Sequence, residues 1–335
     1  WMIFLIVNEQ IPRDAEIFVA EQYVPADLVV DVSNEWEEIK PFWKAYAQGG
    51  EEPGGMMLAG TEEKMAKLEP KYVRLDHIFD DDYYGVVSRD GGGLKFDFSR
   101  LDQIVLDIEE MGAKPFFALS YMPNEIADTK IDQPRDWNDW KQLVKATIGH
   151  YSGTDAKNIS DVYYEVWNEP DLESFGKWHY GGSKNYLELY RWSAEAAREL
   201  RNEGVVNEFK FGGSGITALY RNWVLALRDF AVSNRLPLDF LSWHSYDYDP
   251  DVFARDLDDL DSWLGMDHPY ELIITEWGPD PGKTPIYSGR FAGAHAVSSV
   301  RQMLGRLHWG YMFEVKDGPM QDGFGWGGLT HYEAG

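Results

Sequence analysis

The sequence predicts an α/β protein, a (β/α)8 barrel with a short N-terminal β-appendage. Three observations lead to this prediction. From about residue 40 onward, short runs of β-branched, aromatic and other apolar residues alternate with longer amphipathic stretches. The expected strands recur at the spacing of a β-loop-α-loop unit, which implies parallel strands. Neither an internal repeat nor a Pro/Gly/Ser-rich linker divides the chain. We therefore expect residues 1–38 to form the appendage and residues 39–335 to form the barrel.

Each expected strand is a short apolar run bounded by polar or turn residues. In chain order the eight strands are 43–48, 72–76, 115–121, 162–168, 209–213, 240–246, 272–276 and 311–315. The clearest helix between them has Ser99 as candidate N-cap and Gly112 just past its end, with apolar residues at the i, i+3, i+4 spacing. Further helices are expected near 137–148, 186–200, 223–231 and 292–307.

The two ends of the chain do not follow the barrel period. Residues 17–24 and 28–32 resemble two strands of the appendage. The apolar run 1–7 is far shorter than the ~20 residues that span a bilayer, so we expect no stable membrane insertion. The chain does not begin with Met, and this run is open to two interpretations, the remnant of a signal or anchor or a buried strand. Because little sequence follows the eighth strand, we expect an incomplete C-terminal wall unless residues 323–335 replace the eighth helix.

The composition excludes several classes of protein. The chain has 57 acidic and 31 basic residues and a formal net charge of −26, which argues against nucleic acid or an anionic membrane surface as partner. An aromatic content of 15% excludes a disordered chain. The absence of cysteine excludes disulfides, zinc–thiolate sites and a cysteine nucleophile.

Two expected strands deliver a glutamate to the face of the barrel on which active sites lie. The fourth strand continues into Trp167-Asn168-Glu169-Pro170, and the seventh ends in Thr275-Glu276-Trp277. Two carboxyl groups that face one cavity are what glycoside hydrolysis requires, one as a protonated acid and one as an ionised carboxylate. The sequence therefore indicates a glycoside hydrolase.

These two segments also carry a family resemblance. They match the strand-four and strand-seven signatures of the retaining clan A glycoside hydrolases, and within this clan the chain most resembles glycoside hydrolase family 39, which contains β-xylosidases and α-L-iduronidase. The likeness extends over about residues 28–331. The matching segments are 71–74, 80–82, 114–116, 121–123, 165–172, 237–240, 243–246 and 323–325.

The resemblance implies a double-displacement mechanism that needs no metal and no cofactor. Glu169 would be the general acid/base and Glu276 the nucleophile, and their carboxyl groups would lie about 5–5.5 Å apart. The expected substrate contacts are Asn168 on the sugar 2-hydroxyl, Arg74 and Tyr246 around the nucleophile, and His244 and Trp277 along the subsite of the reacting sugar.

The chain also departs from the xylosidase pattern. The histidine expected two residues after the strand-two arginine is replaced by Asp76, with His77 displaced by one, and the strand-eight aromatic is replaced by Met312. We expect Asp76 and Glu314 to be further substrate contacts, with a structural role as the alternative for each. Glu165 is expected to be structural. These departures leave the sugar and the linkage open.

Other interpretations remain at this stage. One is an endo-acting polysaccharide hydrolase of the same clan, which an open groove rich in tryptophan would favour over a blind pocket. Another is a non-catalytic carbohydrate-binding barrel, and a third is a purely structural protein. The expected partner is an oligosaccharide or polysaccharide, with the oligomeric state open. The acidic surface favours an extracellular or cell-envelope location without excluding the cytoplasm.

Overall fold

The structure is a computed structural model that describes residues 39–49, 57–91, 93–317, 325–326, 328 and 330–331. The strands expected at 17–24 and 28–32, and with them the appendage, lie outside the described residues. In the part of the chain that is described, no helix is both long and apolar enough to span a membrane.

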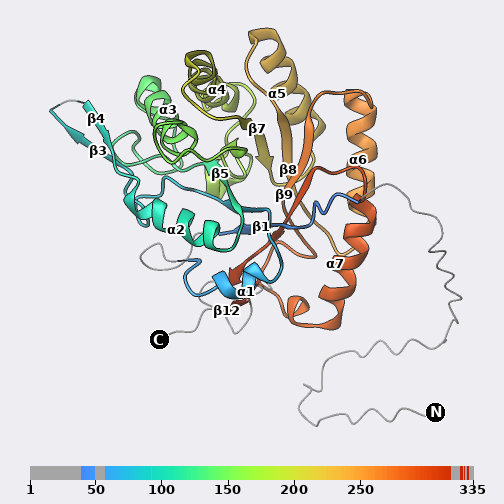
Figure 1. The fold of residues 1–335 in the computed structure, drawn as a ribbon. Coiled ribbons are helices and arrows are strands. Elements are labelled where there is room, and N and C mark those ends of the chain that lie inside the picture. The colour runs from blue at the N-terminus through green and yellow to red at the C-terminus, as the bar shows by residue number, and fades with distance from the viewer. Residues whose placement is uncertain are drawn as a thin grey trace, which may run out of the picture. The chain divides into compact units, whose positions relative to one another are not determined.

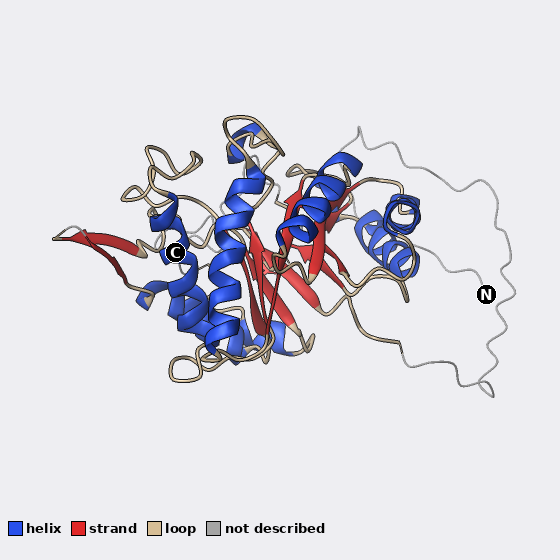
Figure 2. Cartoon of the chain, turned by 90° about the horizontal axis from the view of Figure 1, so that it is seen from above, coloured by secondary structure: helices blue, strands red, loops and turns tan. Residues whose placement is uncertain are grey.

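Eight parallel strands close into a barrel, as the sequence predicts. Around the barrel their order is β1-β10-β9-β8-β7-β6-β5-β2, with β2 pairing back onto β1. Figure 2 shows these strands surrounded by helices. The strands are β1 (Ala45–Gln48), β2 (Tyr72–Leu75), β5 (Lys114–Leu119), β6 (Val162–Val166), β7 (Phe209–Ile216), β8 (Phe240–Tyr246), β9 (Glu271–Gly278) and β10 (Trp309–Phe313).

Seven helices occur among the described residues, and α2 to α7 follow the barrel strands in the expected alternation (Figure 1). They are α1 (Glu62–Ala66), α2 (Ser99–Glu110), α3 (Trp137–Ser152), α4 (Tyr186–Glu203), α5 (Arg221–Asn234), α6 (Asp251–Leu264) and α7 (Arg290–Met303). An antiparallel hairpin, β3 (Val87–Asp90) with β4 (Gly93–Phe96), projects beside α2. The sequence analysis did not predict α1 and α6. In α6, Phe253, Leu257 and Leu260 form the buried face at helical spacing.

Aromatic side chains fill the barrel at the amino-terminal half of its strands. Phe116 of β5 stacks on Tyr163 of β6, with ring centroids 5.3 Å apart, and Tyr311 of β10 meets Phe116 edge to face. Tyr72 and Phe240 complete this layer. The barrel is therefore a packed core below the level of Arg74, and any site must be built on its carboxyl-terminal side.

The strand β9 carries one residue more than its neighbours, which changes where its side chains point. Between two successive paired positions, β8 advances from Trp243 to His244 while β9 advances from Ile274 to Glu276. β10 shows the same offset, because Gly310 pairs with Ile274 and Met312 with Trp277. This β-bulge lets Thr275 and Glu276 both face the barrel interior, where a regular strand would send one of them outward.

The chain after β10 forms no helix among its described residues. β11 (Lys316–Asp317) pairs with β12 (Thr330–His331), and the Asp317 carboxylate accepts hydrogen bonds from the backbone N–H groups of Trp326 and Gly328. This segment brings the Trp326 ring edge to face against Phe313, with centroids 5.5 Å apart. Most of residues 323–335, which were expected to replace the eighth helix, lie outside the described residues.

Candidate active site

Arg74 is the centre of the polar layer directly above the aromatic core. It is fully buried on β2, and its guanidinium donates to three different acceptors. Nε and one terminal nitrogen bond Oε2 of Glu165 at 2.9 and 2.7 Å, and that same nitrogen bonds Oδ1 of Asn168 at 2.7 Å. The other terminal nitrogen bonds Oε1 of Glu276 at 2.9 Å. One cation therefore fixes side chains from β6 and β9 relative to each other.

The carboxyl group of Glu276 has a raised pKa and is bonded by two donors. Besides Arg74, it accepts a hydrogen bond from the Tyr246 hydroxyl at 2.9 Å, on Oε2. Burial raises the pKa of the Glu276 carboxyl, while the positive charges of His244 and Arg74 lower it. The Arg74 guanidinium and the Tyr246 hydroxyl favour the carboxylate form of Glu276, because both donate hydrogen bonds to it. Its position at the cavity floor suits a nucleophile.

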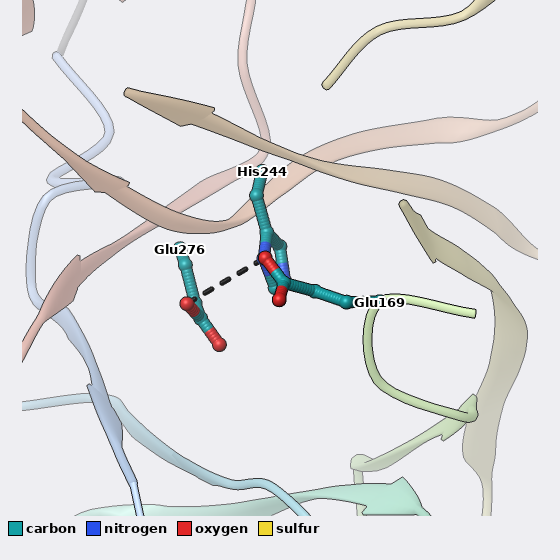
Figure 3. A group of neighbouring side chains, drawn as sticks. All are labelled: Glu169, His244 and Glu276. Atoms are coloured by element: carbon teal, nitrogen blue, oxygen red, sulfur yellow. Dashed lines mark hydrogen bonds and ion pairs between the residues drawn. The ribbon is translucent and has the colours of Figure 1, made fainter. Parts of the chain in front are cut away.

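Glu169 lies at the carboxyl-terminal end of β6, and it is more exposed than Glu276: 15% of its side chain is accessible against 8%. Its Oε1 lies 2.9 Å from Nδ1 of His244, and the same nitrogen lies 3.5 Å from Oε2 of Glu276 (Figure 3). Burial lowers the pKa of His244, but the negative charges of Glu276 and Glu169 outweigh it, so this pKa lies above its usual value. The imidazole therefore links the two carboxyl groups.

The backbone at the end of β6 adopts unusual conformations. Trp167 and Glu169 have φ of 72° and 42°, in the left-handed region that costs a non-glycine residue about 1–2 kcal/mol. The N–H of Glu169 donates to the carbonyl of Gly215 on β7 at 2.8 Å, and the indole of Trp167 donates to the carbonyl of Phe175 at 2.9 Å. Such strained residues concentrate at functional sites, and here they turn Glu169 toward the cavity.

A cavity of about 780 Å³ opens above this network at the carboxyl-terminal end of the barrel. Its lining contains five of the predicted site residues, Asp76, Asn168, Glu169, Tyr246 and Glu276, so both carboxyl groups face one cavity. Asn168 uses its Oδ1 to accept from Arg74, which leaves its NH₂ group to donate toward a ligand. Arg74 and His244 lie directly behind the lining.

Of the substrate contacts predicted at Asp76, Glu314 and Trp277, one lines the cavity and two do not. Asp76 lines the cavity at the end of β2, as expected. Glu314 is buried behind Gly49, where it accepts from the Gln48 amide at 3.4 Å. Trp277 packs in the outer layer of the core, edge to face with Phe253 of α6. The expected contact between Trp277 and the sugar is therefore wrong for this arrangement, because Trp277 points to the opposite side of β9 from Glu276.

The cavity also contains aromatic residues that the sequence analysis did not assign. Phe313 and Trp326 line it on the side of β10, while Met312 packs against the outer core. The strand-eight aromatic is thus present as Phe313, one position after the residue at which it was expected. The two-residue alternation that puts Tyr311 inside the barrel also puts Phe313 there, and this signal was available in the sequence.

Two further acidic residues belong to the site, Asp80 in the loop after β2 and Glu165 on β6. Asp80 is buried, lines the cavity and accepts a hydrogen bond from the Lys130 ammonium at 2.9 Å. Glu165 is structural, as expected, yet it does more than fill the core. Its carboxylate accepts from Arg74 and, at 3.1 Å, from Thr275. It neutralises and orients the cation that holds Glu276.

Glu169, His244 and Glu276 are also side chains of the metal-ligand type, with one donor atom from each lying within 4.8 Å of the others. In this arrangement those atoms already bond one another, Arg74 and Tyr246. The group therefore has the chemistry of a paired carboxylate site in which the His244 imidazole, with a raised pKa, lies between the two acids.

Comparison with known proteins identifies relatives of the chain. The sequence profile described as Glycosyl hydrolases family 39 matches residues 28–256. A β-xylosidase from Caldicellulosiruptor saccharolyticus is 33% identical over 255 residues, which cover 69% of this chain and 50% of that protein. A β-xylosidase from Geobacillus stearothermophilus is 29% identical over 241 residues, 65% of this chain and 45% of that protein. The chain spans about half the length of these curated relatives.

Solved structures show the same fold. The crystal structure of the GH39 enzyme from Xanthomonas axonopodis pv. citri has a TM-score of 0.72 and 23% identity, and it covers 87% of this chain and 63% of that one. A GH39 β-xylosidase from Caulobacter crescentus has a TM-score of 0.72 and 21% identity, with 87% and 67% covered. At these identities the structural likeness concerns the barrel itself.

Proposed function

This chain belongs to glycoside hydrolase family 39, and on that premise we propose that it cleaves glycosidic bonds with retention of configuration, through a covalent glycosyl–enzyme intermediate. The substrate we propose is a neutral, β-xyloside-like glycoside. The chemistry follows from two carboxyl groups in one cavity and from the different surroundings of each.

The observation that carries the proposal is the short distance between the two acids. An oxygen of Glu169 and an oxygen of Glu276 lie within 4.8 Å of each other. Retaining glycosidases hold their carboxyl groups about 5–5.5 Å apart, whereas inverting enzymes leave about 6.5–9.5 Å for a water molecule between acid and sugar. The spacing favours direct attack by a carboxylate on the anomeric carbon.

Glu276 is assigned the attack and Glu169 the proton transfer. In the first step Glu276 bonds the anomeric carbon while the glycosidic C–O bond breaks, and Glu169 gives its proton to the departing oxygen. In the second step Glu169 takes a proton from water, the water oxygen bonds the anomeric carbon, and the bond to Glu276 breaks. Arg74 and Tyr246 stabilise the carboxylate that is released.

The charges around the cavity favour a neutral sugar. Asp76, Asp80, Glu169 and Glu276 line it, and the ammonium of the lining residue Lys130 is already bonded by Asp80 at 2.9 Å and by Asp82 at 3.2 Å. A uronic acid would bring a further negative charge next to these carboxylates. Neutral pyranosides avoid this repulsion, and the names of the β-xylosidase relatives favour xylose among them.

A panel of aryl glycosides tests the proposal: xyloside, glucoside, galactoside, arabinoside and glucuronide, with Glu276→Gln as the blank. We expect hydrolysis of the β-xyloside, lost in the blank, and no release from the glucuronide. Proton NMR of the first product formed should show the β-anomer. An α-anomer as first product would contradict retention, and hydrolysis of the glucuronide in preference to the xyloside would contradict the choice of sugar.

A further inference from the structure

A second hollow lies on the surface next to the cavity, and Tyr220 lines both of them. It measures about 490 Å³ and is formed by the segment after β6, the start of α5, and α6. Tyr220 is 45% exposed, and Tyr180, which also lines the hollow, is 42% exposed. Exposed aromatic rings of this size next to a reaction cavity are a feature that the two-step mechanism leaves unexplained.

The position of Glu169 indicates which end of the substrate faces the hollow. The cavity wall on the side of Tyr220 also contains Leu172 and Thr217, which follow β6 and β7. Glu169 also follows β6 and lines the cavity, so it belongs to the same wall as Leu172. Since Glu169 protonates the departing oxygen in the proposed mechanism, the part of the substrate beyond that oxygen leaves the cavity toward Tyr220.

The lining of the hollow has the chemistry that binds sugars. The Tyr180 ring is held edge to face by Trp223, with centroids 5.5 Å apart, and Trp263 of α6 lines the same hollow. Asn222 and Asp259 add an amide and a carboxylate. A pyranose has apolar C–H faces that pack on aromatic rings and hydroxyl groups that bond amides and carboxylates, so both parts of this lining suit it.

We propose that this hollow binds sugar units on the leaving-group side of a neutral glycan chain, so that the preferred substrate is an oligosaccharide longer than a disaccharide. This inference rests on the proposed function, because Glu169 defines the leaving-group side. The size of the cavity agrees with it, since about 780 Å³ is several times the volume of one pyranose.

The test compares long and short substrates in variants of residues that line the hollow alone. In Tyr180→Ala and Trp263→Ala, kcat/KM for xylohexaose should fall about five- to tenfold, while kcat/KM for 4-nitrophenyl β-xyloside stays unchanged. Tyr180→Phe keeps the ring and should restore most of the loss. Trp192→Ala is the matched control, because Trp192 lies on α4 against Arg191, away from the hollow. Equal losses on both substrates, or no loss on xylohexaose, would overturn the proposal.

A binding measurement separates this inference from the proposed function. Calorimetric titration of xylohexaose into the Glu276→Gln variant, with and without Trp263→Ala, requires no turnover. If the wild-type chain cleaves no aryl glycoside but Trp263→Ala weakens xylohexaose binding, the hollow is a sugar-binding site and the proposed reaction is wrong. If aryl xyloside is cleaved and the affinity for xylohexaose is the same in both forms, the proposed reaction is supported and the proposed role of the hollow is wrong. Thermal unfolding of each variant checks that the fold is retained.

Discussion

The carboxyl-terminal ends of β6 and β9 each deliver a glutamate to the cavity, and they do so in opposite ways. At β9 a bulge turns Glu276 inward, where Arg74 and Tyr246 bond both of its oxygens. At β6 a backbone with positive φ turns Glu169 outward to the cavity, where the described contact of its carboxyl group is His244. The comparison shows that the two glutamates have different surroundings: two donors bond the buried Glu276, while the more exposed Glu169 contacts His244. In the proposed mechanism Glu276 acts as the anion and Glu169 as the proton donor.

The largest effect is expected from removing the charge at β9. Glu276→Gln should reduce kcat by ~10⁴-fold or more on every glycoside, because the amide neither attacks the anomeric carbon nor pairs with Arg74. Steady-state rates on the aryl xyloside measure this. A variant that keeps wild-type turnover would remove Glu276 from the mechanism.

Removing the acid at β6 should depend on the leaving group. Glu169→Ala should lower kcat/KM by about 10²–10⁴-fold on oligosaccharides, whose alkoxide leaving groups need a proton. Activated aryl glycosides should be far less affected in their first step. A series of aryl xylosides with increasing leaving-group pKa measures this dependence, and equal losses across the series would show that Glu169 donates no proton.

Glu165 supports the Glu276 carboxylate of β9 indirectly, because both carboxylates bond Arg74. Glu165→Gln should lower kcat by about 10²-fold and unfolding free energy by about 3 kcal/mol, because it leaves the buried Arg74 with one carboxylate partner fewer.

The matched control for this variant is Glu271→Gln. Glu271 bonds Tyr163 at 2.7 Å and Lys210 at 2.8 Å, but it lies at the opposite end of the barrel from the cavity and is partly exposed. Glu271→Gln should lower the unfolding free energy somewhat without lowering kcat. Rates and denaturant unfolding of both variants measure the difference, and a Glu165→Gln protein with normal kcat would limit Glu165 to stability.

The pH dependence reports on the imidazole between the two glutamates. Activity requires ionised Glu276, so it falls as pH drops through that pKa, which burial raises above the usual value for glutamate. The positive charge on His244 lowers the same pKa. His244→Gln should therefore move the acidic limb of the kcat/KM profile to higher pH by about one unit. An acidic limb that does not move would mean that His244 carries no charge in the active form, and one that moves to lower pH would contradict the expected effect of its charge.

The smallest effect concerns the backbone that supports β6. Gly215 has φ of +57°, and a Cβ there would lie 3.0 Å from Oε1 of Glu165. Gly215→Ala should cost about 1–2 kcal/mol of stability and a few-fold in kcat. Gly112→Ala is the control, with φ of +80° and open space around the added carbon, and it should cost stability alone. Equal rates in the two variants would show that crowding at Gly215 does not reach the site.

Local patterns in the sequence were sufficient to predict the barrel and to select Glu169 and Glu276 as candidate site residues. Strand alternation and the short motifs around these two glutamates are local signals. The role of Glu165 was not accessible in this way. Its partner Arg74 is 91 positions away, and only the closed barrel brings them together. The bulge on β9 was hidden for the same reason, since it is defined by pairing with β8 and β10.

Local signals correct two of the predictions, the placement of Trp277 and the missing helix α6. Trp277 follows Glu276 directly, and beyond the bulge that places Thr275 and Glu276 on one face the side chains of β9 alternate again, so Trp277 faces the outer core. Helix α6 was missed because its start is a run of aspartates, although Phe253, Leu257 and Leu260 behind it have helical spacing.

The aromatic layer under Arg74 has a consequence for the traffic of molecules through the site. Phe116, Tyr163, Phe240 and Tyr311 close the barrel on its amino-terminal side, so the released sugar returns through the mouth by which the glycan entered. A free monosaccharide in solution can then reoccupy the place next to Glu276 by the same route. We expect competitive inhibition by the sugar product, and its inhibition constant would measure the affinity of the site for that sugar.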